Sequence, residues 1–433
     1  MITFLCILIT FMIISCKECT TEPIVYPPTE LSLDYRGANF VWLRLSMADS
    51  GSVQNYLIKR NNSELLSGQF IGADTLITDD TVLPDSTYIY KAYRTRRGNP
   101  VDSSDVVEVI TLDTTSHDFH WEIDTLGDYG SCIYDVFAFS ENEVWAVGEI
   151  KLEDQPGHSY GFAIWDGSTW TLKRLEAESH SVEPYMMNVR PRGIYAFSTS
   201  DIWFACGGIF HWDGNQTTFV WERDTDTNES CVKVWGSSPD NIYFVGYEGL
   251  IVHYDGINFT RMDSGTDTEL RDIDGMVDPV TGKIRIWVTG IGVLLYSEGD
   301  DWEVIWDYDH PYFEDNFNNP NTVYVPDDKV FTVSVWGGDN SGVYLFNQLC
   351  PKENHLLFNH DLYVRGMGGN DVNDFCIVGN RNIVYHYNGN TARRYPELEL
   401  GGFSLGVVQV GNKIFIVGDS GSSYRAIVFR GVR

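Results

Sequence analysis

A short β-rich run that ends in glycine recurs along the chain and limits its possible folds more than any other sequence feature. The run occurs as EVWAVG (ending at Gly148), DIWFACG (Gly207), NIYFVG (Gly246), RIWVTG (Gly290), TVSVWG (Gly337), DFCIVG (Gly379) and KIFIVG (Gly418). Most of these seven occurrences are about 40–47 residues apart, and one spacing is longer because residues 151–160 form an insertion. A regular period of this length indicates a chain built from repeated structural units.

Each unit is predicted to contain four short strands. One strand precedes the glycine-ending run, a third follows it, and a fourth begins near an aromatic residue such as Trp170, Phe259 or Trp302. The third and fourth strands are joined by turns such as HWDG, HYDG and HYNG, because Asp-Gly and Asn-Gly tolerate positive φ. Four short strands at this period predict the blade of a β-propeller, so residues 117–433 are predicted to carry seven blades.

An isolated run, FHWEIDTLG at residues 119–127, precedes the first complete unit but has the pattern of a fourth strand. It matches NFTRMDSG at 258–265, with Trp121 in the position of Phe259, whereas the last unit reaches only its third strand at 425–431. We therefore predict that the isolated strand completes the seventh blade and closes the ring. Closure of roughly 315 residues costs about 5 kcal/mol, and burial of Trp121 is expected to contribute about 3–5 kcal/mol against this cost.

Residues 30–113 are predicted to form a separate β-sandwich, because six β-rich runs in this segment alternate with turn-forming residues. Within it, LPDSTYIY at 83–90 resembles the tyrosine corner of fibronectin type III domains, and Trp42 lies where that family places its core tryptophan. The resemblance implies that Tyr88 bonds back to the backbone and that the domain is a spacer. The whole chain is thus predicted to be all-β, a fibronectin III-like sandwich followed by a seven-bladed propeller.

The N-terminal segment resembles that of bacterial lipoproteins. Residues 1–14 are almost wholly apolar, a stretch too short to span a bilayer comfortably, and they lead into the sequence IISC. This sequence resembles a lipoprotein cleavage site, although no Lys or Arg precedes the apolar stretch. The resemblance implies a signal peptide at 1–15, a lipidated Cys16, an extended tether at 16–29 and attachment to the outer membrane or cell surface.

The charge of the chain argues against a nucleic-acid partner. Asp and Glu number 61 against 30 Lys and Arg, which gives a formal net charge of −31, and an acidic surface repels phosphate backbones. The cysteines show no zinc-type spacing. We therefore expect neither a bound metal nor a cofactor.

Basic residues recur near the start of the first strand of several units, where a propeller has one mouth of its central channel. The bases are Arg190, Arg192, Lys233, Arg271 and Arg365, and the acids beside them are Asp135, Asp272 and Asp274. In one interpretation, the last four of these bases form an anion-binding mouth for an acidic glycan or a carboxylate-bearing partner. In the simpler interpretation, the bases pair with the three acids around the channel.

An insertion at residues 307–321 departs from the repeat and is predicted to project as a long loop. It is acidic, aromatic and rich in turn residues, and long loops on rigid scaffolds are frequent binding sites. Exposed Tyr312, Phe313 and Phe317 could stack on sugar rings or dock on a protein. The alternative is a packed loop that covers the ring.

The repeats lack the signatures of WD40 and kelch propellers. They resemble the loosely defined repeats of bacterial exported propellers, some of which are similar to the photosystem II assembly factor, and this resemblance implies no activity. We predict a monomeric, non-catalytic lipoprotein whose propeller binds a protein or a glycan. One alternative is an envelope enzyme that acts on polysaccharide at the channel mouth, although no spacing singles out a carboxylate pair. The other is a structural assembly factor without a small ligand.

Overall fold

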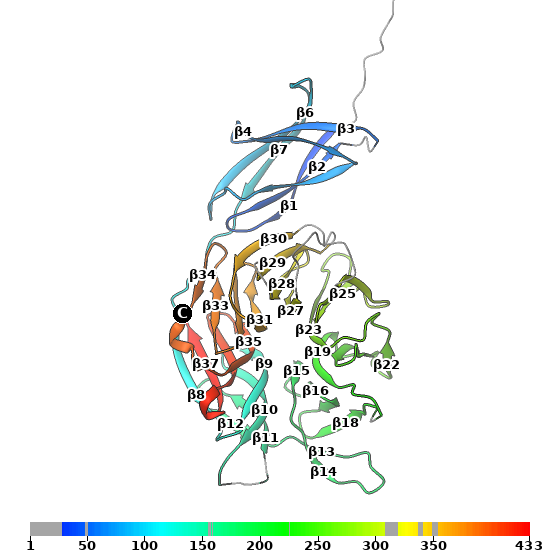
Figure 1. Cartoon of the computed structure of the whole chain (residues 1–433), viewed down its shortest axis with the longest axis vertical. Helices are drawn as coiled ribbons and strands as arrows, with labels where there is room; N and C mark the ends of the chain where they lie inside the picture. The colour runs from blue at the N-terminus through cyan, green and yellow to red at the C-terminus, as the bar shows by residue number, and fades with distance from the viewer. Residues whose placement is uncertain are drawn as a thin grey trace, which may run out of the picture. The chain divides into compact units, whose positions relative to one another are not determined.

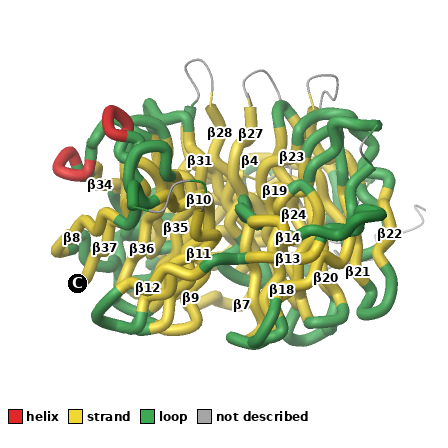
Figure 2. Tube along the Cα trace, turned by 90° about the horizontal axis from the view of Figure 1, so that it is seen from below, coloured by secondary structure: helices red, strands yellow, loops and turns green. Residues whose placement is uncertain are grey.

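The computed structural model describes residues 28–47, 51–154, 157, 159–224, 226–307, 319–336, 341–348 and 354–433. They form two compact units, of which the second comprises Tyr35–Trp42, Thr78–Thr87 and Ile110–Arg433 and the first comprises the rest. Within these ranges, helical structure is limited to the short 3-10 turns η2 (Pro396–Leu398) and η3 (Gly421–Ser423) (Figure 2). The prediction of an all-β chain is therefore confirmed. No helix in the described ranges has the length and apolarity needed to cross a membrane.

Strands β1–β7 form two sheets. The three-stranded sheet contains β1 (Thr29–Arg36), β2 (Val41–Met47) and β5 (Asp74–Asp79), and the four-stranded sheet contains β4 (Ser63–Ile71), β3 (Val53–Arg60), β6 (Thr87–Arg96) and β7 (Asn99–Ile110), each in this order. Trp42 and Tyr90, one from each sheet, are fully buried. Tyr88 is half-buried, and the guanidinium of Arg60 lies 5.2 Å from the centre of its ring.

The repeat region forms four-stranded antiparallel sheets, seven of them within the described residues. Their strands, in the order in which they pair, are β9 (Cys132–Ser140), β10 (Glu143–Lys151), β11 (Ser159–Trp165) and β12 (Trp170–Lys173); β15 (Gly193–Ser198), β16 (Asp201–Cys206), β17 (Gly208–Trp212) and β18 (Thr217–Trp221); β19 (Cys231–Ser238), β20 (Asn241–Gly246), β21 (Ile251–Tyr254) and β22 (Phe259–Met262); β23 (Leu270–Val277), β24 (Ile284–Gly290), β25 (Val293–Ser297) and β26 (Glu303–Asp307); β27 (Asn319–Tyr324), β28 (Val330–Trp336), β29 (Gly342–Asn347) and β30 (Asn354–Asn359); β31 (Val364–Asp371), β32 (Asp374–Gly379), β33 (Val384–Tyr387) and β34 (Ala392–Arg394); and β35 (Phe403–Val410), β36 (Lys413–Asp419), β37 (Ala426–Val432) and β8 (His120–Thr125). The glycine-ending run supplies the second strand of every sheet.

The first strands of these sheets surround a common centre (Figure 1). Each first strand contacts the first strand of the next sheet, from β9 through β15, β19, β23, β27 and β31 to β35, and β35 contacts β9. Apolar side chains fill the space between neighbouring sheets. Between the sheet of β9 and the sheet of β35, for example, Val144 and Trp165 pack with Phe415 and Val428. The sheets thus bury their faces against each other, as repeated units must in order to be stable.

Strand β8 lies beside β37, although about 300 residues separate them in the chain. The register runs from His120 opposite Val432 to Thr125 opposite Ile427. Arg430 forms ion pairs with Asp124 and Glu122, and the indole Nε1 of Trp170 in β12 donates to Asp124 Oδ2 at 2.8 Å. The side chains of β8 therefore bridge the sheet of β35 and the sheet of β9.

Trp121 is only partly buried on this strand. Its ring lies 5.2 Å from that of Tyr395 and 5.7 Å from that of Phe119. It also covers Gly431, where an added Cβ would come within 2.8 Å of the indole. Phe119 is the more buried of the two aromatic residues, with 9% of its surface exposed. We therefore expect Trp121 to contribute about 2–3 kcal/mol, below the value for full burial.

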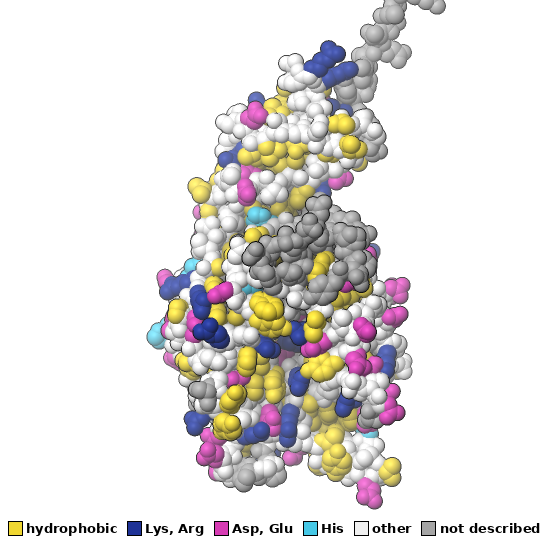
Figure 3. Space-filling model, in the orientation of Figure 1, with side chains coloured by type: hydrophobic (Ala, Val, Ile, Leu, Met, Phe, Trp, Pro, Cys, Tyr) yellow, Lys and Arg dark blue, Asp and Glu magenta, His cyan; other side chains and the backbone are white. Residues whose placement is uncertain are grey.

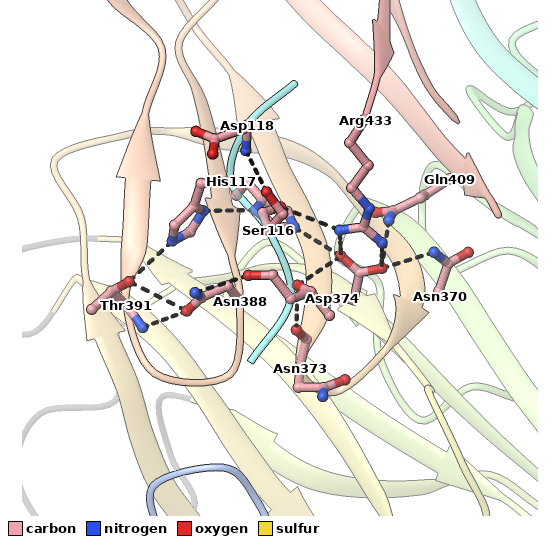
Figure 4. A network of polar contacts seen from close by, with 12 residues as sticks. Ser116, His117, Asp118, Asn370, Asn373, Asp374, Asn388, Thr391, Gln409 and Arg433 are labelled. Atoms are coloured by element: carbon pink, nitrogen blue, oxygen red, sulfur yellow. Dashed lines mark hydrogen bonds and ion pairs between the residues drawn. The ribbon is translucent and has the colours of Figure 1, made fainter. Parts of the chain in front are cut away.

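The carboxylate of Asp374 is the centre of a polar network beside β8 (Figure 4). It accepts hydrogen bonds from the side chains of Thr115, Asn370, His386, Gln409 and Arg433. These bonds hold the pKa of Asp374 well below its ordinary value although burial opposes them. Next to this cluster, Asn373 Nδ2 donates to the carbonyl oxygen of Asp113 at 2.8 Å. Residues 113–118 are thereby fixed to the sheet of β31.

Two features differ from the sequence-based expectation. A hairpin of β13 (Glu176–Glu178) and β14 (Met186–Asn188) interrupts the repeat between β12 and β15 and was not predicted. The predicted insertion at 307–321 is also too long, because β26 ends at Asp307 and β27 begins at Asn319. The sequence Asn-Pro-Asn is typical of a turn, but proline is tolerated near the start of a strand.

Candidate binding site at the channel mouth

A β-bulge occurs at the same place in nearly every first strand. The extra residues, which pair with nothing across the ladder, are Tyr134, Val232, Arg271, Asn321, Arg365 and Leu405. Arg192 holds the corresponding position in front of β15, where its N–H donates to the carbonyl oxygen of Ala205. We call these seven the rim residues. A bulge turns a side chain out of the regular alternation, and here it turns them towards one cavity.

The recurring glycines make room for these bulges. Gly148, Gly246 and Gly379 each lie opposite the residue that precedes the bulge. A Cβ added at Gly148 would come within 2.2 Å of the carbonyl oxygen of Cys132 in β9, and one added at Gly246 would come within 1.8 Å of that of Ser230, the residue before β19. A larger residue would clash with this backbone. In the sheets of β9, β19, β23, β31 and β35, the glycine that marks the repeat in the sequence therefore also marks the place of a rim residue.

All seven rim residues line a single cavity of ≈ 290 Å³ at one end of the channel. Its other lining residues include Lys233, Tyr247, Glu269 and Tyr363. Figure 3 shows Lys and Arg side chains near the middle of the second unit. The structure thus brings together the four predicted bases of the mouth. That they bind a ligand stays a prediction, and Tyr312, Phe313 and Phe317 lie outside the described residues.

Tyrosine rings hold the three rim arginines. Arg192 Nη1 donates to the hydroxyl of Tyr247 at 2.6 Å, and its guanidinium lies 5.9 Å from the centre of the Tyr134 ring. Arg271 donates to the hydroxyl of Tyr363, and Arg365 lies 5.3 Å from the centre of the same ring. Aromatic partners orient a guanidinium without cancelling its charge.

Positive charge remains at this mouth. Lys233 is neutralised as in the simpler interpretation, because its Nζ lies 2.9 Å from Asp135 Oδ1. Among the described residues, Arg192 and Arg365 have no ion pair, and Glu269 is the sole carboxylate that lines the cavity, 3.4 Å from Arg271 Nε. Burial and the nearby guanidinium of Arg271 lower the pKa of Arg365, as expected where like charges gather.

Asn321 is the least expected of the rim residues. It is 3% exposed, and within the described part of the chain neither Oδ1 nor Nδ2 has a hydrogen-bond partner. A buried amide without partners is costly. A ligand that offers one donor and one acceptor would satisfy it. The residue was missed because the predicted insertion included it.

Below the mouth, carboxylates connect the first strands of neighbouring sheets. Asp135 Oδ2 accepts from the N–H of Ile194, and Asp274 Oδ2 accepts from the N–H of Val325 at 2.8 Å. Burial raises the pKa of Asp272 to about 6 and that of Asp274 to about 7. Burial opposes the charge of Lys233, but Asp135, Asp272 and Asp274 together raise its pKa.

Asp274 should make stability depend on pH. Its raised pKa means that its contribution to stability is present below the unfolded value of about 4 and is lost as the pH rises through about 7. We expect the free energy of unfolding of Asp274→Asn, relative to the unmodified chain, to rise by about 2 kcal/mol from pH 5 to pH 8. Any hydrogen bond lost with the amide adds a constant offset. Urea unfolding at the two pH values measures the slope, and Asp213→Asn, at an exposed turn, should give none.

Three histidines occupy equivalent repeat positions and are structural. His211 Nε2 lies 2.8 Å from Asp201 Oδ1, His253 Nε2 lies 2.7 Å from Asn241 Oδ1, and His386 Nε2 lies 2.9 Å from Asp374 Oδ1. Each histidine thus pairs with the first residue of the second strand in its own sheet. Within the described ranges, no three His, Cys, Asp or Glu side chains converge in a way that could hold a metal ion.

Comparison with known proteins shows the fold. No family model matches the chain, and no curated protein matches it. Among solved structures, "YCF48 bound to D1 peptide" is 14% identical with a TM-score of 0.52, and the match covers 74% of this chain and 98% of that chain. The WD40 β-propeller domain of Doa1 (11% identity, TM-score 0.48, 73% and 98% covered) and the C-terminal WD40 domain of Sif2 (10%, 0.45, 94% and 99%) are also similar. The likeness to YCF48 confirms the predicted β-propeller and is consistent with the predicted similarity to the photosystem II assembly factor.

Proposed function

We propose that the propeller binds a partner protein through a carboxylate-bearing segment that enters the mouth. The observation that carries this proposal is the group of three rim arginines, which face one cavity lined by a single described carboxylate. Arginine pairs with carboxylates through two parallel hydrogen bonds. The unpartnered amide of Asn321 suits a peptide bond, which offers both a donor and an acceptor. YCF48, the neighbour named above, was solved with a bound peptide, which lends support.

An acidic glycan is the second candidate. The hydroxyls and rings of Tyr134, Tyr247 and Tyr363 at the mouth suit a sugar that carries a carboxylate. Hydrolysis of such a glycan would require two carboxyl groups on opposite sides of the bond. Glu269 is the one carboxylate among the described lining residues, and Arg271 is beside it. These observations favour binding without catalysis.

The architecture that we propose is a ring of seven blades closed by β8 and preceded by a fibronectin III-like sandwich. The ring is supported by the contacts between successive first strands and by the pairing of β8 with β37. The sandwich is supported by one sheet of three strands and one of four, in the orders given above. The buried side chain of Trp42 agrees with this proposal, and the hydrogen bond of Tyr88 to the backbone is a further part of it.

We also propose that the chain is a monomer anchored by a lipid on Cys16 at the outer membrane or cell surface. The support is the apolar segment at 1–14 followed by IISC. Cys16 and the tether to residue 27 lie outside the described residues. Metabolic labelling with an azido fatty acid, compared between the unmodified chain and Cys16→Ala, tests the anchor. Label that persists in Cys16→Ala would contradict it.

Single substitutions of the rim arginines should weaken binding strongly. We expect Arg192→Ala and Arg365→Ala each to lower affinity for an acidic peptide at least about 10-fold, because a buried carboxylate then loses its charged partner. The probes are arrays of acidic and neutral peptides and of acidic and neutral glycans, with dissociation constants measured by calorimetry on the best binders. Arg261→Ala, which removes an arginine from outer strand β22, is the matched control.

The two candidates make different predictions for these arrays. Binding of acidic peptides alone that is lost in the rim variants supports the protein partner. Binding of acidic glycans alone, with the same loss, replaces it with the glycan. Binding that is equal in the rim variants and in Arg261→Ala would refute a site at the mouth, and glycan cleavage would refute the non-catalytic assignment.

A further inference from the structure

Three aromatic rings lie in a row along one side of the mouth. Trp336 ends β28, Tyr363 lies just before β31 and Phe403 begins β35, so three successive sheets each contribute one ring. The rings of Trp336 and Tyr363 lie 5.0 Å apart at an angle of 71°. The guanidinium of Arg365 connects the other two, because it lies 5.3 Å from the centre of the Tyr363 ring and 4.9 Å from that of the Phe403 ring. We call Trp336, Tyr363 and Phe403 the aromatic wall.

The two ends of the aromatic wall are exposed to solvent. Trp336 is 40% and Phe403 is 38% exposed, whereas Tyr363 is partly buried and lines the cavity of the mouth. Figure 3 shows hydrophobic side chains beside the Lys and Arg side chains near the middle of the second unit. Aromatic residues and arginine are enriched in protein interfaces and supply much of their binding energy. The aromatic wall therefore offers apolar contact area directly beside the charged mouth.

Arg365 holds a carboxylate-binding group against this wall. Its Nε donates to Asn380 Oδ1 at 2.9 Å. In the described part of the chain its guanidinium has no other hydrogen bond and no ion pair, so both Nη groups can bind a carboxylate. A carboxylate bound there lies beside the ring of Phe403. Since consecutive Cα atoms are about 3.8 Å apart, side chains one or two positions from the acidic residue reach the aromatic wall.

We propose that the partner segment carries an aromatic or branched aliphatic side chain within two positions of its acidic residue, and that this side chain packs against the aromatic wall. The inference rests on the proposed function and adds the residue beside the carboxylate to what the mouth recognises. Trp336 and Tyr363 meet as a corner, and Arg365 covers one face of Phe403. A corner encloses a compact apolar side chain, whereas a sugar stacks on a flat, open ring face. The shape of the wall therefore favours a peptide.

The test uses the full chain and nine-residue peptides with one central Asp in a background of Gly and Ser. In separate peptides, each of the two positions before and after the Asp carries Phe, Leu or Ala. We expect the best Phe or Leu peptide to bind at least about 10-fold more tightly than its Ala counterpart, because its side chain leaves water for the wall. Dissociation constants come from calorimetry, and their ratio is the apolar preference.

Variants locate the origin of this preference. Trp336→Ser combined with Phe403→Ser should reduce the apolar preference to less than about 3-fold. Trp336→Phe combined with Phe403→Leu should retain it, because the wall stays apolar. Tyr185→Ala, which removes a 61% exposed ring from the hairpin of β13 and β14, is the matched control. Arg365→Ala should weaken the Ala and Phe peptides alike, since it removes the partner of the carboxylate.

The outcomes separate this inference from the proposed function. If the Asp peptides bind and require Arg365, but Ala serves as well as Phe or Leu or the Ser pair keeps the preference, the aromatic wall is refuted and the proposed function stands. If no Asp peptide binds, or if Arg365→Ala binds them equally well, the proposed function fails and the wall with it. Binding of acidic glycans alone that is lost in the Ser pair would replace the peptide side chain with a sugar.

Discussion

Deletion of residues 117–127 is expected to abolish the cooperative unfolding of the propeller while the sandwich still unfolds as a unit. The deletion removes the strand that pairs with β37 from Val432 to Ile427, and it removes Phe119 from an apolar core. It also leaves Arg430 without Asp124. Loss of Phe119 and Trp121 together should cost about 5–6 kcal/mol, which is comparable to the whole stability of a typical domain.

Differential scanning calorimetry of the full chain and of the deletion variant measures this effect. We expect the transition of the propeller to broaden or disappear and the transition of the sandwich to persist. Phe119→Ala alone should lower the free energy of unfolding by about 3 kcal/mol. Ile123→Ala, on the same strand but 45% exposed, should change it by less than about 1 kcal/mol. A deletion variant that melts like the full chain would show that β8 does not hold the ring together.

Asp374→Ala is expected to have the second largest effect, a loss of about 3–5 kcal/mol. The carboxylate is 3% exposed and binds a partly buried guanidinium, that of Arg433. Without it, the charge of Arg433 is left unpaired in a poorly hydrated place, and the donors on Gln409 and Asn370 lose their acceptor. Removal of one partner of a buried pair costs more than removal of both.

A double-mutant cycle separates these contributions. Asp374→Ala combined with Arg433→Met should be more stable than Asp374→Ala alone, because the unpaired charge is then absent. The control is Asp361→Asn, at an exposed ion pair with Arg394, which should cost less than about 1 kcal/mol. If Asp374→Ala costs no more than this control, the network in Figure 4 does not stabilise the fold.

Much of the fold could be predicted from local sequence because the same strand and turn patterns recur in each unit. A run such as NIYFVG must bury both faces of a central strand, and Asp-Gly turns fix the next connection, so period and composition agree on a propeller. The pairing of residues 119–127 with the last unit required one further comparison. The pattern of these residues is that of a fourth strand, and the last unit is the one that lacks a fourth strand of its own. The positions of Arg192, Lys233, Arg271 and Arg365 near one mouth followed from the same alignment of first strands.

The roles of these bases could not be predicted, because a bulge changes which way a side chain points. Lys233 and Arg271 both lie near the start of a first strand. Arg271 is the bulged residue of β23, whereas Lys233 follows the bulged residue of β19 and pairs regularly with the second strand of its sheet. Both residues line the cavity at the mouth, but the ammonium of Lys233 pairs with Asp135. This difference depends on register against the second strand. Asn321 has no glycine marker, because the residue that precedes its bulge, Pro320, lies opposite Val335 and not opposite a glycine.

The attachment of residues 113–118 to the sheet of β31 has a mechanical consequence. A pulling force transmitted along the chain from β7 reaches Asp113 before it reaches β8, and there the backbone is held by Asn373 and then by hydrogen bonds of Thr115 with Asn388. These bonds take up the tension before it reaches β8. We therefore expect β8 to stay paired with β37 until these hydrogen bonds break.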